Sequence, residues 1–307
     1  VIFAGTRYIN DALRQSDLDI MDIDLPFSAN LDSNSITLND AAIALDCIKL
    51  TLDGVLKMAS AQQPMTVDMK FATNDIVISD VLPYLPDKMV TLPRGMAVDA
   101  RLQADGHARG IVQGDTLPVV DCHLTLGEGQ FAYSALPAKV KNIAADLTAA
   151  LDLSQATPSS VKINTFTAQM NSNKIHLTGK IDDLMGDMDI DVNADGSIVL
   201  SDVMDFLPDT MPLSASGTAK INLAARTTMK QISNMDIQHM RIKAKMDIDN
   251  LDATYDSIHA LSPHLALNVQ MPSPQRRIAE AELADLNLSS DKLEVELPSS
   301  KTTVQLK

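Results

Sequence analysis

The segment Leu213-Ser-Ala-Ser-Gly-Thr-Ala-Lys-Ile-Asn-Leu-Ala-Ala225 decides the fold class of this chain. Leu, Ala, Gly and Ile occupy its odd-numbered positions, and Ser, Thr, Lys and Asn occupy the even-numbered positions as far as Asn222. Because successive side chains of a β-strand point to opposite faces of a sheet, this alternation predicts a strand with one apolar and one solvated face. At about 3.3 Å per residue, such a strand would span roughly 40 Å.

The same alternation recurs in much of the chain, and no segment has the pattern of a long helix. It is found in residues 96–104, 143–153, 240–248 and 265–271. Strands with one apolar face each must cover that face, either by closing into a sandwich or barrel or by curling into an open trough. The length of the strands and the scarcity of aromatic residues favour the trough. The sequence therefore predicts an all-β protein with a few short helices, whose long, curved, mainly antiparallel sheet forms an open apolar groove.

The chain also repeats itself with a period of about 120 residues. Segments KLTLDG, KIHLTG and KLEVEL begin at Lys49, Lys174 and Lys292, which are 125 and then 118 residues apart. Segments 79–87 and 201–209 both begin with Ser-Asp-Val and are 122 residues apart. Such self-similarity is the signature of a repeat architecture. We predict one continuous β-groove array over residues 1–307, with approximate repeats 1–130, 131–252 and an incomplete 253–307.

Two local features are predicted within the repeats. The apolar residues are at even-numbered positions as far as Leu38 and at odd-numbered positions from Ala41. This change indicates a β-bulge, because one extra residue moves the following side chains to the opposite face of the sheet. The Ser-Asp-Val segments are predicted to be short helices with Ser79 and Ser201 as N-caps, each ended by a proline seven residues later.

Composition and motifs argue against several functions. Of the 307 residues, 45% are hydrophobic but only 3% are aromatic, so Leu, Ile, Val, Ala and 16 Met supply the apolar mass. The net charge of -15 argues against nucleic acid as a partner, because phosphate backbones bind basic patches. Nucleophile, P-loop, dinucleotide and zinc-protease motifs are missing, so we expect no enzyme, no cofactor and no metal. Cys47 and Cys122 are expected to be free thiols, and His259 and His264, which flank a Ser-Pro pair, surface turn residues.

The segment DVNADGSIVLSD, Asp191–Asp202, poses the question of a calcium site. Its Asp, Asn and Asp at positions 1, 3 and 5, Gly at 6 and Asp at 12 approach the spacing of an EF-hand loop. The sister repeat places Met69 and Phe71 at two of these positions, and a strand rather than a helix leads into the segment. We therefore favour a strand with a solvated acidic face that ends in an Asp195-Gly196 turn.

The arrangement I-x-L-x-G-x-I-x-D-L (175–184), D-x-D-I-x-V (187–192), G-S-I-x-L-x-D-V-x-x-F-L-P (196–208) and L-x-A-S-G-x-A (213–219) resembles the C-terminal region of the AsmA-like family. These proteins are relatives of TamB and, more distantly, of the repeating β-groove bridge-like lipid transfer proteins. The resemblance implies a taco-like groove in the periplasm of a Gram-negative bacterium, anchored to the inner membrane by an N-terminal helix outside this chain. It also implies a part in phospholipid transport between the inner and outer membranes and in outer-membrane homeostasis.

The resemblance implies no catalytic residue. It implies as partners a phospholipid or other acyl-chain lipid, the inner membrane and envelope proteins, and the groove would be lined by alternate strand residues. The small residues among them are expected to leave room for an acyl chain. The predicted lining residues are Met96, Val98, Ala100, Leu102, Leu147, Leu151, Ala215, Gly217, Ala219, Ile221, Leu223, Met240, Ile242, Met246 and Ile248.

Two other functions remain open on the residues alone. One is a structural or surface β-repeat scaffold with a sealed core. The other is a calcium-dependent interaction module centred on Asp191–Asp202.

Overall fold

The computed structural model of the chain divides into two compact units. The first comprises Val1–Ala132, Asn142–Asn164 and Asp182–Gly186, and the second comprises Tyr133–Lys141, Thr165–Ile181 and Asp187–Lys307. The structure describes residues 2–4, 20–24, 27–30, 34–45, 48–81, 96–133, 138–152, 154, 157–204, 212–234, 236, 239–272, 277–278, 281–282, 285–297 and 300–306.

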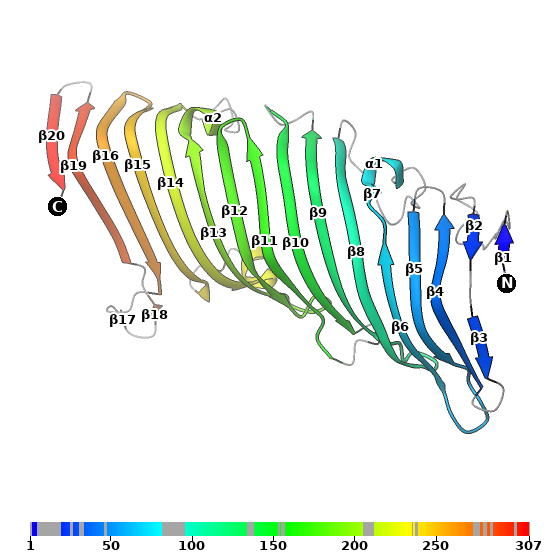
Figure 1. Cartoon of the computed structure of the whole chain (residues 1–307). Coiled ribbons are helices and arrows are strands. Elements are labelled where there is room, and N and C mark those ends of the chain that lie inside the picture. Colours follow the sequence, from blue (N-terminus) through cyan, green and yellow to red (C-terminus); the bar gives the residue numbers. More distant parts are fainter. Residues whose placement is uncertain are drawn as a thin grey trace. The chain divides into compact units, whose positions relative to one another are not determined.

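Strands dominate the described residues, and the helices among them are short (Figure 1). The first strands are β1 (Ile2–Ala4), β2 (Ile20–Asp24), β3 (Phe27–Asn30), β4 (Ser35–Leu45), β5 (Ile48–Lys57), β6 (Met65–Thr73) and β7 (Ile76–Val77). They are followed by β8 (Met96–Val112), β9 (Val119–Tyr133), β10 (Val140–Asp152), β11 (Ser160–Met170), β12 (Asn173–Asp182) and β13 (Asp189–Val199). The last are β14 (Leu213–Thr228), β15 (Arg241–Tyr255), β16 (Ile258–Met271), β17 (Arg277–Ile278), β18 (Ala281–Glu282), β19 (Asp285–Leu297) and β20 (Ser300–Leu306).

Each unit contains an antiparallel ladder of these strands. In the first unit, β1 pairs with β2, β2 and β3 with β4, β4 with β5, β5 with β6, and β6 and β7 with β8. In the second unit, the ladder runs β13, β14, β15, β16, β19, β20. The long strands curve along their length, and neither ladder closes into a barrel among the described strands (Figure 1). The prediction of an all-β fold with an open, curved and mainly antiparallel sheet is thus confirmed.

The strand register places the apolar residues of one strand opposite the apolar residues of its neighbours. In the second unit, Ile221 of β14 pairs with Met246 of β15, Met246 with Leu267 of β16, and Leu267 with Leu288 of β19. One residue along, Lys220 pairs with Asp247, so polar side chains gather on the opposite face. Because the side-chain period of a strand is two, a slip by one residue would place every one of these apolar side chains in the polar row.

Register shifts occur in four of the described strand pairs, and two of them bear on the alternation predicted from the sequence. The register of β4 and β5 shifts between Leu38 and Ala41, where Asp40 has a φ of 50°, as the sequence predicts. A second shift, which the alternation of β14 did not reveal, lies between Ser216 and Thr218 and is matched by an extra residue, Asn250, in β15.

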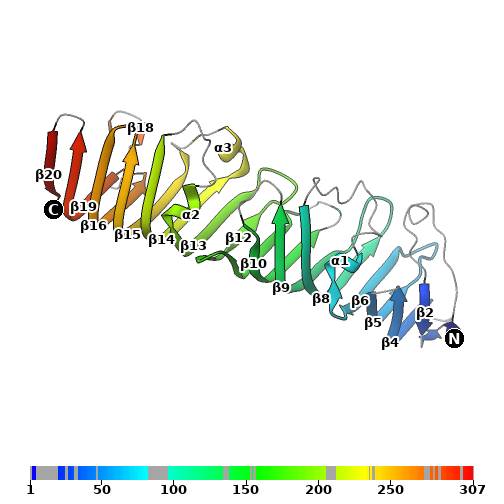
Figure 2. The same cartoon turned by 90° about the horizontal axis from the view of Figure 1, so that it is seen from above.

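Three short helices punctuate the described chain. The first two, α1 (Ile78–Val81) and α2 (Leu200–Met204), occupy the two Ser-Asp-Val segments, and each packs against the strand that follows it, β8 or β14 (Figure 2). Both begin one residue before the serine, so Ser79 and Ser201 lie in the first turn rather than at the predicted N-cap, and the two prolines lie outside the described residues. The third helix, α3 (Met229–Ser233), was not predicted, although Thr228 and Gln231 form the capping box that begins it.

Two turn predictions are wrong. Strand β13 runs without a break through Asp195 and Gly196, and Gly196 pairs with Ile221. A Cβ on Gly196 would lie 2.5 Å from the carbonyl oxygen of Lys174, so this glycine permits a close approach of backbones rather than a turn. Likewise His259 and His264 both lie within β16 and not in a surface turn, because β16 continues through the Ser-Pro pair.

Candidate functional site

The apolar side of the second unit's ladder is a candidate functional surface. Matched positions form transverse rows, since Val192, Ala225, Ile242 and Met271 are successive partners from β13 to β16. We call this surface the second-unit apolar face. Its further rows are Ala194, Leu223, Ala244, Val269 and Leu286; Gly196, Ile221, Met246, Leu267 and Leu288; and Ile198, Ala219, Ile248, Leu265 and Ser290.

Most of the second-unit apolar face is not covered. No large side chain is fully buried among the residues that the structure describes. Leu286 is 67% exposed and Leu288 is 42% exposed, although both lie in the apolar rows. A sandwich or barrel core would bury such side chains almost completely. The described part of this face is therefore an aliphatic surface that a further molecule can contact.

In each unit, a short helix packs against a strand that carries a buried alanine. In the second unit, Ala219 is 0% exposed and pairs with Ile198, two residues before α2 begins. In the first unit, Ala100 is 4% exposed on β8, the strand against which α1 packs. Each Ser-Asp-Val helix thus lies against a strand that carries one of the nearly inaccessible alanines.

All but one of the predicted lining residues lie on the strands β8, β10, β14 and β15. Met240 directly precedes β15. Of the others, Met96, Val98, Ala100 and Leu102 lie on β8, Leu147 and Leu151 on β10, Ala215, Gly217, Ala219, Ile221 and Leu223 on β14, and Ile242, Met246 and Ile248 on β15.

Two small residues have other roles than the one expected of them. The expectation was that Gly217 and Ala219 leave room for an acyl chain. Gly217 has a φ of 119°, and a Cβ there would lie 2.7 Å from the carbonyl oxygen of Asn250, so the glycine accommodates the bulge. Ala219 is already covered, so its side chain is not accessible to a ligand.

The lining residues predicted from the sequence do not include the apolar rows of β4, β5 and β6 in the first unit. Leu52 of β5 pairs with Phe71 of β6, and Phe71 pairs with Gly106 of β8. A Cβ on Gly106 would lie 2.5 Å from the carbonyl oxygen of Asp121 and 2.6 Å from the Phe71 ring, so the glycine permits the approach of both the β9 backbone and this aromatic side chain. The short apolar alternations of residues 50–52 and 67–71 could have indicated these rows. They are short because Gly54 and the bulge in β4 interrupt the pattern.

The cysteine prediction is tested for one residue. Cys122 is a free thiol in β9, half-buried, and burial raises the pKa of its thiol. Cys47 lies outside the described residues.

The histidines share a feature that the sequence did not suggest: each of the six pairs with an aspartate. His264 lies directly across from Asp249 with 2.9 Å between Nδ1 and Oδ1, and His259 lies 2.8 Å from Asp252. The other pairs are His107 with Asp68, His123 with Asp105 and Asp146, His176 with Asp195, and His239 with Asp236. Five of these six histidines lie on strands and join neighbouring strands through their pairs.

The His123 cluster is the most connected of these pairs. Its Nε2 lies 3.0 Å from Asp146 and its Nδ1 lies 3.3 Å from Asp105, while the Asn164 side-chain amide donates to Asp146 at 2.8 Å. The hydrogen bond with Asp146 raises the pKa of His123, and the one with Asp105 acts in the same direction. The hydrogen bonds from Asn164 and then His123 lower the pKa of Asp146.

This cluster predicts a pH-dependent stability. A histidine whose pKa is raised by folding stabilises the fold below its ordinary pKa, and that contribution is lost as the pH rises through the folded value. We expect the melting temperature to fall as the pH rises above about 6.5, the ordinary pKa of histidine, and to fall less in His123→Gln. His239→Gln, which removes a loop histidine instead, is the matched control. Equal pH slopes for His123→Gln and the wild type would contradict the assignment.

The acids of Asp191–Asp202 do not converge as in an EF-hand loop. Asp191, Asn193 and Asp195 lie at alternate positions of the continuous strand β13, so successive side chains are about 6–7 Å apart along the strand. Asp195 pairs with His176 instead, and Asp202 accepts a hydrogen bond from Asn173 at 2.9 Å. The described residues hold no cluster of three or more His, Cys, Asp or Glu with the geometry of a metal site.

None of the helices in the described part of the chain has the length and apolar character needed to cross a membrane. The chain matches no family model, no curated protein and no solved structure.

Proposed function

We propose that this chain is a non-enzymatic, AsmA-like envelope protein that shields lipid acyl chains and so contributes to phospholipid transport between the inner and outer membranes. In this proposal it acts in the periplasm, attached to the inner membrane. The observation that carries the proposal is the uncovered second-unit apolar face, where aliphatic rows run across four or more neighbouring strands.

The energetics of lipid movement support such a role. A diacyl phospholipid carries on the order of 30 methylenes, and at about 0.8 kcal/mol each their exposure to water costs roughly 25 kcal/mol. An aliphatic surface lowers this cost without chemistry or a cofactor. Met246 and Met271 suit such a surface, because methionine is unbranched and adapts to flexible ligands.

The alternative functions receive less support. A scaffold with a sealed core needs buried apolar side chains, whereas Leu286 and Leu288 are exposed. A calcium module at Asp191–Asp202 needs a loop that wraps around the ion, whereas β13 is an extended strand.

Native mass spectrometry of the chain purified from bacterial envelopes tests the proposal. We expect co-purified phospholipid, and we expect the delipidated protein to bind a long-chain fluorescent fatty acid that added phospholipid displaces. A protein that carries no lipid and binds none in vitro would refute acyl-chain shielding. Short-chain soluble analogues serve as the control, because they have too few methylenes to bind by burial alone.

A further inference from the structure

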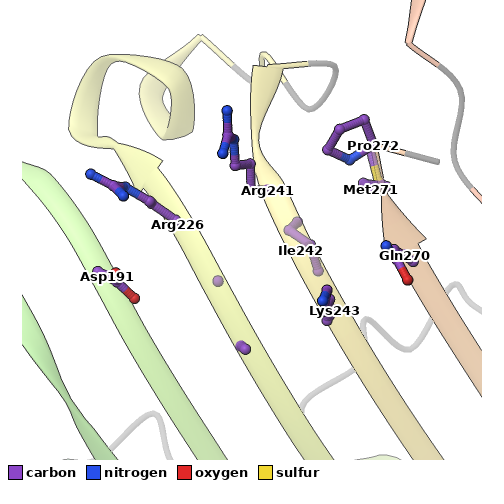
Figure 3. A pocket seen from close by; sticks show the side chains of 10 residues that line it. Asp191, Arg226, Arg241, Ile242, Lys243, Gln270, Met271 and Pro272 are labelled. Carbon is purple, nitrogen blue, oxygen red and sulfur yellow. The ribbon is translucent and has the colours of Figure 1, made fainter. Parts of the chain in front are cut away.

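A depression of about 420 Å³ lies where β14 ends, β15 begins and β16 ends (Figure 3). Its lining includes Arg226, Arg241 and Lys243, together with Asp191, Gln270 and the small residue Ala224. Lys243 pairs across the strands with Ala224 and with Gln270, so these three residues form one row of the polar face. Because Ala224 has no side chain beyond Cβ, the cationic side chains around it border a hollow.

The row that contains Arg241 has an unbalanced charge. Asp191 pairs with Arg226, and Arg226 pairs directly with Arg241. Like charges at directly opposed positions of two strands repel each other, so an anion nearby would stabilise this arrangement. Arg226 has one, because its guanidinium donates to Asp189 at 3.2 Å. On the other side of Arg241, β16 ends at Met271, and Pro272 follows without a charge.

Arg241 differs from the other arginines whose side chains the structure describes. Arg101 binds Glu128 at 2.8 Å, Arg109 binds Asp121 at 2.7 Å, and Arg226 binds Asp189. Arg241 has no carboxylate partner among the described residues, although the chain has 40 acidic residues and a net charge of -15. Within the described part of the chain no carboxylate engages its guanidinium, which leaves it available to an anion from outside that part.

A second depression of about 390 Å³ adjoins the first and shares Arg226 and Arg241 with it. Thr228, Gln231 and His239 line it as well, and they add hydroxyl, amide and imidazole groups. Three cationic side chains and two carboxylates, Asp189 and Asp191, line the two depressions together. The lining of the two depressions thus carries one more positive than negative side chain, on a strongly acidic protein.

We propose that Arg241 and Lys243, with Gln270 beside them, form a binding site for a phosphate-bearing anion. A planar guanidinium donates two parallel hydrogen bonds to a phosphate, and an ammonium group adds a second positive charge. The anion relieves the repulsion between Arg226 and Arg241. The phosphate comes from a lipid headgroup at the rim of the sheet or from a soluble phosphate ester. The site lies on the polar side of the sheet, so it does not depend on the proposed acyl-chain shielding.

Titration of the full chain with glycerol phosphate, followed by calorimetry, tests this site. We expect saturable binding that weakens with salt, and we expect Arg241→Gln and Lys243→Gln each to weaken it by about fivefold or more. The matched control is Lys220→Gln, because Lys220 lies on the same polar face but pairs with Asp249 at 3.9 Å. Equal affinity in Arg241→Gln and in the wild type, or no binding at all, would overturn the proposal.

Vesicles distinguish the two sources of the phosphate. Phosphatidylglycerol vesicles that bind the wild type more tightly than Arg241→Gln would identify a lipid headgroup, whereas binding of glycerol phosphate alone would identify a soluble ester. Both results support the site. The Leu267→Asp variant, altered on the apolar side, is expected to keep its affinity for glycerol phosphate, so failure of the acyl-chain proposal leaves this one separately testable.

Discussion

Leu267→Asp is expected to weaken acyl-chain binding by about tenfold to a hundredfold and to leave the fold intact. Leu267 lies in the middle of the second-unit apolar face, between Met246 of β15 and Leu288 of β19. A carboxylate at this point would lose water when an acyl chain covers it, and an unpaired charge in an apolar contact is costly. Because the side chain is only half-buried in the free protein, the unliganded fold loses little. Displacement of a fluorescent fatty acid measures the effect.

The matched control for this variant is Asn268→Asp. Asn268 is the next residue of β16, faces the polar side and pairs with Lys245, so a carboxylate there is solvated and lies near a positive charge. We expect its acyl-chain affinity to equal that of the wild type. If Leu267→Asp binds as well as Asn268→Asp while both have native circular dichroism spectra, the apolar face is not the acyl-chain site.

Gly217→Ala is expected to destabilise the second unit by about 2–4 kcal/mol. Its φ of 119° lies outside the range that alanine adopts readily. An added Cβ would lie 2.7 Å from the carbonyl oxygen of Asn250 and 2.8 Å from that of Asp249. Relief of both contacts requires that β14 and β15 separate at the bulge. Urea unfolding measures the loss, and hydrogen exchange should locate it in the amides of β14 and β15.

Gly127→Ala is the corresponding control. Gly127 lies in β9, and a Cβ there would meet no atom within 4 Å. We expect its free energy of unfolding to stay within about 0.5 kcal/mol of the wild type. A stability of Gly217→Ala that is indistinguishable from that of Gly127→Ala would mean that the bulge is not constrained as described.

The strands could be predicted because alternation is a property of neighbouring residues. The regular pattern of Leu213–Ala225 predicted β14, and the parity shift between Leu38 and Ala41 predicted the bulge in β4. The prediction of a turn at Asp195-Gly196 was wrong because the same dipeptide occurs both in tight turns and where two strands approach each other closely. Only the position of Lys174 on the neighbouring strand separates these possibilities.

Positions on the candidate surfaces were harder to predict, because exposure depends on partners distant in the sequence. Ala219 and Leu267 follow the same alternation, yet Ala219 is covered beside α2 and Leu267 is not. The His264–Asp249 pair has a separation of 15 residues, and the alternation of either strand contains no sign of it. The pairing of Arg226 with Arg241 is equally invisible until the two strands are in register.

The sequence by itself determined that this protein is built of long strands with one apolar and one polar face. Side chains of a strand alternate between its two faces, so alternating apolar and polar residues are sufficient to predict it. Only the tertiary structure decided which apolar side chains stay accessible, which aspartate pairs with each histidine, and which arginine has no carboxylate partner among the described residues. These properties depend on register and on the close approach of backbones, which hydrogen bonding between distant segments sets.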